Sequence, residues 1–70
     1  MRDVIDIHVN GKTRRVEAGT SVAGLLRELD LDGRTVVVEL NRQIVRRTEI
    51  DSIALEKGDR IELVHFVGGG

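Results

Sequence analysis

Residues 4–17 read VIDIHVNGKTRRVE, and this stretch decides the fold. Its first half alternates with the period of a half-buried strand. The apolar face of that strand carries Ile5, Ile7 and Val9. Asn10 and Gly11 follow, and this pair favours a type I′ turn because both central residues of that turn need a positive φ. Residues 12–17 predict a returning strand that turns Val16 towards the core, so the chain opens with a β-hairpin.

The spacing of the apolar residues changes after the hairpin. The stripe of an amphipathic helix, at i, i+3, i+4 and i+7, is formed by Val22, Leu25, Leu26 and Leu29. Thr20 or Ser21 is placed to cap the N-terminus of this helix. We expect it to end at about Leu29, because residues 30–34 (DLDGR) supply turn residues and Gly33 can adopt the left-handed conformation.

The second half of the chain predicts three further strands. Residues 35–40 (TVVVEL) are β-branched and indicate a short central strand, and residues 43–45 (QIV) leave room for a brief fourth strand. One helical turn is expected within residues 49–53 and a tight turn at residues 56–59. The last strand covers residues 60–67.

This order, β-β-α-β-β-β, predicts the α+β class and a ubiquitin-like β-grasp fold. The first and last strands are expected to pair in parallel, and the helix to pack on one face of a mixed sheet whose other face stays open. Residues 1–67 would form this domain, and residues 68–70 a flexible C-terminal glycine tail.

Composition excludes several kinds of function. The chain has 70 residues, no cysteine and two histidines, which argues against a disulfide, a redox thiol or a metal site. A net charge of -1 gives no electrostatic footprint for nucleic acid or an anionic membrane, and no apolar run could span a bilayer. Nucleophile–base pairs, opposed carboxylates and nucleotide-binding loops are not legible either. We therefore expect a cytoplasmic protein that is not an enzyme and whose partners are proteins.

The chain ends on VHFVGGG, residues 64–70. Glycine loses the most entropy on ordering, so three of them cannot serve stability. A chain without side chains can enter a slot about as narrow as a backbone and present its terminal carboxylate to another enzyme for activation. The alternative interpretation is an idle, frayed tail.

The element order, the LNRQIV step (residues 40–45) and the ending EKGDRIELVHFVGGG (residues 56–70) resemble the ThiS family, the sulfur carriers of thiamine biosynthesis. The resemblance implies that an ATP-dependent adenylyltransferase like the ubiquitin-activating enzymes adenylates the carboxylate of Gly70. It further implies that a sulfur donor, a cysteine desulfurase or a persulfide, converts this group to a thiocarboxylate for thiazole synthase. ATP would be used by the activating partner, and this chain would bind no cofactor. Gly68 and Gly69 would thread the partner's channel.

Apolar residues beside the tail are candidates for partner binding. Val64 and Phe66 share the strand face opposite the core, and Phe66 is the sole aromatic residue. Phe66 could instead fold over the sheet edge as a lid on the core. Val67 continues this segment into the tail, and Arg42 could steer association with an acidic surface.

Three other functions remain open for the same fold and tail. The first is the small subunit of molybdopterin synthase, also a sulfur donor. The second is a protein modifier that forms isopeptide bonds through Gly70, although only two lysines, Lys12 and Lys57, offer internal acceptors for chain formation. The third is an interaction module with an idle tail.

Overall fold

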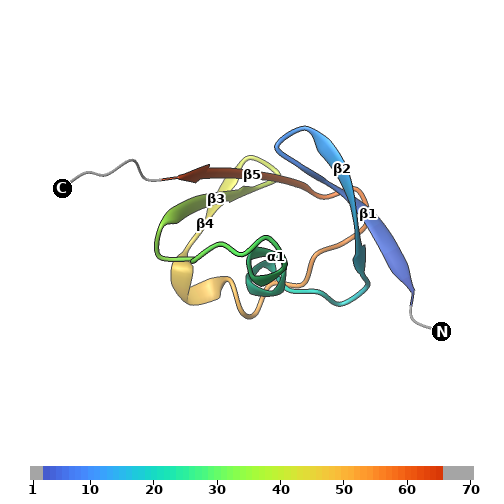
Figure 1. Ribbon diagram of the computed structural model, residues 1–70, viewed down its shortest axis with the longest axis horizontal. Coiled ribbons are helices and arrows are strands. Elements are labelled where there is room, and N and C mark those ends of the chain that lie inside the picture. Colours follow the sequence, from blue (N-terminus) through green and yellow to red (C-terminus); the bar gives the residue numbers. More distant parts are fainter. Residues whose placement is uncertain (1–2, 66–70) are drawn as a thin grey trace.

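A computed structural model describes residues 3–65 of the chain. The elements, shown in Figure 1, are β1 (Val4–Val9), β2 (Lys12–Glu17), α1 (Val22–Glu28), β3 (Val36–Leu40), β4 (Gln43–Val45), the 3-10 helix η1 (Arg47–Glu49) and β5 (Arg60–His65). The predicted order of strands and helix is confirmed. The last strand was expected to reach Val67, but residues 66 and 67 lie outside the described part of the chain.

The strands form one mixed sheet in the order β2-β1-β5-β3-β4. β1 pairs with β5 in parallel, as predicted, and the other neighbours are antiparallel. The expectation that residues 35–40 form the central strand is wrong in one respect, because β5 holds the middle position and β3 lies beside it. The outer strands of the two hairpins, β2 and β4, form the two edges of the sheet. The last strand, β5, joins the hairpins because it pairs with β1 on one side and with β3 on the other.

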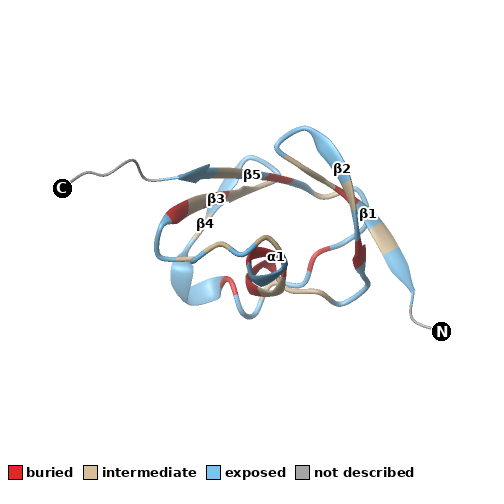
Figure 2. Cartoon of the chain, viewed as in Figure 1, coloured by how far each residue is buried: buried red, intermediate tan, exposed pale blue. Residues whose placement is uncertain are grey.

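The core lies between the sheet and α1, and the buried residues, red in Figure 2, gather on the helix and on the strand segments that face it. Ile7, Leu25 and Ile61 are among the most deeply buried side chains. Val16 is also buried, as its phase in the sequence predicted. No polar or charged residue in the described part of the chain belongs to the buried class.

The N-terminus of α1 has a partner for each of its first four backbone N–H groups. Ser21, one of the two predicted caps, accepts the N–H of Gly24 through its hydroxyl at 2.9 Å and that of Leu25 through its carbonyl at 2.9 Å. The N–H groups of Val22 and Ala23 donate to carbonyls of the loop before β5, at residues 53 and 50. Because these donors would otherwise lack a partner, the loop and the helix hold one another in place.

The C-terminus of α1 differs from the prediction. Asp30, not Gly33, adopts the left-handed conformation, with φ 58. The N–H of Leu31 donates to the carbonyl of Leu26 at 2.8 Å and that of Asp30 to Arg27 at 3.0 Å, which is a Schellman motif. Gly33 serves a different purpose, because a Cβ there would lie 2.8 Å from Cδ1 of Ile50.

The helical turn predicted within residues 49–53 lies earlier, at Arg47–Glu49. After it, the N–H of Ser52 donates to the carbonyl of Glu49 at 3.0 Å in a turn, and the carbonyl of Ile50 accepts the N–H of Ala23 at 2.9 Å. The predicted tight turn at residues 56–59 is confirmed: Gly58 has φ 83, and the N–H of Asp59 donates to the carbonyl of Glu56 at 3.0 Å.

Candidate functional site

The middle strand of the sheet, β5, is the last described element before Gly70, the residue predicted to carry sulfur. β5 ends at His65, which is exposed and lies opposite Val36 of β3. The last described residue of the chain therefore lies at the end of the middle strand of the sheet. The residues predicted to act there, Phe66, Val67, Gly68, Gly69 and Gly70, lie outside the described residues, so their roles remain predictions.

The face of the sheet opposite α1 exposes apolar side chains close to the end of β5. Val64, a predicted partner-binding residue, is 58% exposed and lies opposite Val37. Ile44 on β4 is 69% exposed and lies opposite Glu39. Glu39 in turn lies opposite Glu62 of β5. Residues that pair across strands share a face, so Ile44, Glu62 and Val64, which are exposed, lie on one face with Val37 and Glu39, which are half-buried. We call these five residues the exposed patch.

Ile44 was not among the predicted partner-binding residues. The strand Gln43–Val45 is too short to show a period of its own. The available signal was the alternation of Ile44 with Val45, which packs against the core. A residue next to a core residue in a strand faces the opposite side of the sheet.

The two glutamates give the exposed patch its charge. Glu39 and Glu62 are directly opposite one another, and neither side-chain carboxylate has a hydrogen bond or an ion pair with any residue from 3 to 65. Like charges at such positions destabilise a sheet. A basic side chain on a partner would relieve this repulsion, so the exposed patch suits a surface that is apolar with a positive charge.

Arg42 lies at the other end of β5 from Val64. It occupies the β3–β4 turn after Asn41, next to the start of β5, where the N–H of Arg60 donates to Oδ1 of Asn41 at 2.9 Å. The structure thus does not bring Arg42 and Val64 together. Arg42 is exposed and has φ 71, a left-handed conformation that residues other than glycine rarely adopt.

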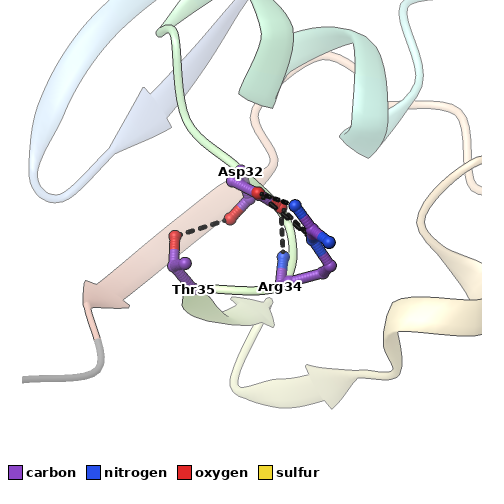
Figure 3. Close-up of polar contacts among 3 residues, drawn as sticks. All are labelled: Asp32, Arg34 and Thr35. Atoms are coloured by element: carbon purple, nitrogen blue, oxygen red, sulfur yellow. Dashed lines mark hydrogen bonds and ion pairs between the residues drawn. The ribbon is translucent and has the colours of Figure 1, made fainter. Parts of the chain in front are cut away.

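One carboxylate has a strongly shifted pKa, and its cause is local. Asp32 accepts bonds from the guanidinium of Arg34, at 2.8 Å to Nη2, and from the backbone N–H of Arg34 at 2.8 Å (Figure 3). These hydrogen bonds lower the pKa of Asp32 from 3.8 to about 2. The carbonyl of Asp32 also accepts the hydroxyl of Thr35 at 2.9 Å, so this group closes the loop before β3. A structural role accounts for the shift.

Residues 3–65 contain no group of histidine, aspartate and glutamate side chains that could hold a metal ion. No helix in this part of the chain is long and apolar enough to cross a membrane.

The helix packs on one face of a mixed sheet, and the first and last strands pair in parallel at the centre of that sheet. Together with the glycines at residues 68–70, these features define a ubiquitin-like β-grasp protein. The family model described as the ThiS family matches residues 7–70, and the chain belongs to this family. The sequence-based recognition and the fold class are therefore confirmed.

Individual relatives agree with this assignment. The sulfur carrier protein ThiS of Bacillus subtilis is 35% identical over 65 residues, covering 91% of this chain and 98% of that protein. The crystal structure of the thiamine biosynthesis protein (ThiS) from Geobacter metallireducens has a TM-score of 0.81 and 33% identity, covering 94% of this chain and 100% of that one. These two relatives, one described as a sulfur carrier protein and one as a thiamine biosynthesis protein, support membership of the ThiS family.

A thiazole synthase of Magnetococcus marinus is also similar, with 44% identity over 64 residues. That match covers 91% of this chain but 20% of the thiazole synthase. The chain thus corresponds to about a fifth of that longer protein.

Proposed function

We propose that this ThiS-family chain carries sulfur for thiamine biosynthesis as a thiocarboxylate on Gly70. The observation that carries the proposal is that the family match extends to residue 70, a terminal glycine, in a chain without cysteine. With no thiol available, the terminal carboxylate is the group on which this chain can hold sulfur covalently. The chain is then a protein cosubstrate of other enzymes, and its place of action is the cytoplasm.

The transfer needs three steps at the terminal carboxyl group. In the first, a carboxylate oxygen of Gly70 attacks the α-phosphorus of ATP on the adenylyltransferase, and pyrophosphate leaves. In the second, the outer sulfur of a persulfide, formed by a cysteine desulfurase, attacks the acyl carbon and AMP leaves. A thiol then attacks the donor's sulfur in the resulting S–S bond, and the thiocarboxylate leaves. The donor and the thiol remain joined by a disulfide. Gly68 and Gly69 would leave the partner's channel free of side chains.

Thiazole synthase is the proposed acceptor. The support is the thiazole synthase of Magnetococcus marinus, in which a region similar to this chain belongs to the same polypeptide. Joining a carrier to its acceptor raises the effective concentration of one for the other.

The exposed patch is the proposed contact for the adenylyltransferase. Val64 and Ile44 are exposed apolar side chains on the face from which β5 leads to the tail. Buried apolar contacts at the centre of an interface supply most of its binding energy, and a basic group of the partner would pair with Glu39 and Glu62. Phe66 and Val67 would extend this contact towards the channel.

Intact mass after incubation with ATP, an adenylyltransferase of the ubiquitin-activating type and a persulfide donor tests the proposal. We expect exchange of one oxygen for sulfur at Gly70 and its alkylation by a thiol-selective reagent, which excludes oxidation of Met1. A variant that lacks Gly70 is the matched control and should stay unmodified. Conjugates to lysine would instead identify a protein modifier, and a molybdopterin dithiolene product the other sulfur pathway. If the chain stays unmodified although the adenylyltransferase is active, the remaining function is that of an interaction module.

A further inference from the structure

The strand that leads to the tail has little backbone pairing on one of its sides. β5 is in register with β1 at only two positions, His8 with Arg60 and Val9 with Ile61. β1 then ends, and the chain turns away at Asn10, which has φ 50. On the other side, β3 pairs with β5 as far as His65.

The side chain of Asn10 continues the pairing where β1 stops. Its Oδ1 accepts the N–H of Leu63 at 2.8 Å, and its Nδ2 donates to the carbonyl of Leu63 at 3.4 Å. The backbone N–H of Asn10 donates to the carbonyl of Ile61 at 2.9 Å. The carboxamide thus offers one acceptor and one donor, as a peptide group of a further β1 residue would.

Asn10 supplies the last pairing contact of β5 on its β1 side. Beyond Leu63, and within residues 3–65, the ladder of β5 is formed with β3 alone. The point at which β5 loses support from one side therefore depends on this one side chain. That point lies seven positions before Gly70.

We propose that Asn10 is a positioning residue, whose side-chain amide fixes Leu63 and thereby sets the point from which the C-terminal tail reaches its partner. This inference rests on the proposed function. From His65, five residues can span at most about 17 Å. If β5 frays back to Leu63, the free segment becomes longer, and a longer tether lowers the effective concentration of the terminal carboxylate at the adenylating site.

Two substitutions separate this role from the role of Asn10 in the turn. Asn10→Gly and Asn10→Asp both suit the first position of a type I′ turn before Gly11. Asn10→Gly removes both contacts with Leu63, whereas Asn10→Asp keeps the acceptor for its N–H. The difference between the two variants therefore reports on the contact with Leu63 and not on the hairpin.

Amide hydrogen exchange provides the first measurement. In Asn10→Gly we expect the protection of the Leu63 amide to fall by about tenfold or more, since its acceptor is lost. The Val64 amide faces β3, because successive residues of a strand point their backbone groups to alternate sides, and its protection should fall as well if β5 frays back to Leu63. Amides of α1 are the internal control. Asn10→Asp should retain the protection of Leu63. Unchanged protection of Leu63 in Asn10→Gly would overturn the inference.

Adenylation kinetics provide the second measurement, with the full chain and the adenylyltransferase. We expect kcat/KM to fall by about 1.5- to 2-fold for Asn10→Gly, because the effective concentration falls with roughly the 3/2 power of the tether length, and to stay near wild type for Asn10→Asp. Ser21→Ala, which removes the helix cap, controls for stability: its Tm should fall by several degrees without a change in kcat/KM. Wild-type kinetics in Asn10→Gly would overturn the positioning role alone. A wild-type chain that is not adenylated would overturn the proposed function as well.

Discussion

Replacement of Arg42 by glycine should stabilise the fold. Arg42 has φ 71 in the β3–β4 turn. A left-handed conformation costs a residue with a Cβ about 1–2 kcal/mol, and glycine avoids this cost but loses about 0.5–1 kcal/mol more entropy on folding than alanine. The expected net gain in the free energy of unfolding is therefore between about 0 and 1.5 kcal/mol, with a midpoint of about 0.75 kcal/mol. In a domain of this size the midpoint corresponds to a rise in Tm of about 3–6 °C.

Urea and thermal unfolding of Arg42→Gly and Arg42→Ala measure this effect. Both variants lose the guanidinium, but only glycine relieves the left-handed backbone. The midpoint in urea should rise for Arg42→Gly with an unchanged m-value. Equal stability of the two variants would refute the backbone argument.

The same two variants test Arg42 as a partner-binding residue. If its guanidinium steers association, both should weaken association with the adenylyltransferase to the same extent, mainly through a slower on-rate that depends on salt. A wild-type on-rate in both variants would remove Arg42 from the contact surface and leave the stability prediction intact.

Two further predictions concern charges. The folded-state pKa of Asp32 lies at about 2, below 3.8, so its stabilising contribution is complete above about pH 4 and is lost as the pH falls towards 2. Arg34→Met should return this pKa towards 3.8, which NMR titration of the Asp32 carboxyl carbon would measure. Glu62→Gln removes the repulsion with Glu39 and should raise the free energy of unfolding by about 0.2–1 kcal/mol. The same variant should weaken binding of the adenylyltransferase in a calorimetric titration; tighter binding would contradict the proposed basic contact.

The hairpins, the helix and the tight turn could be predicted because their signals are local. Alternation, the Asn10-Gly11 pair and the helical stripe each depend on neighbouring residues, and the structure follows them closely. The errors arose where distant residues decide. Gly33 lies where a helix stop is expected, but the left-handed residue is Asp30, and a Cβ at Gly33 would require the end of the Ile50 side chain to shift. Just after η1, the carbonyl of Ile50 accepts the N–H of Ala23 from the distant helix.

Among the site residues, too, some could be predicted from local signals and others depend on contacts with distant residues. The exposure of Val64 followed from the phase of its strand, and Gly70 was singled out by its place in the sequence and by family resemblance. Ile44 became part of the exposed patch only through its register with Glu39. The opposition of Glu39 and Glu62 likewise requires the pairing of β3 with β5, which no local pattern contains.

The two hairpin turns also act on the last strand. Each turn begins with an asparagine of φ 50, Asn10 or Asn41. Asn10 accepts the N–H of Leu63 from one side of β5, and Asn41 accepts that of Arg60 from the other. A glycine would satisfy the left-handed turn equally well, but it has no amide with which to reach a neighbouring strand. Asparagine at these positions therefore connects each hairpin to the strand that leads to the tail, and this explains how a parallel contact of two residue pairs can hold β5 in the middle of the sheet.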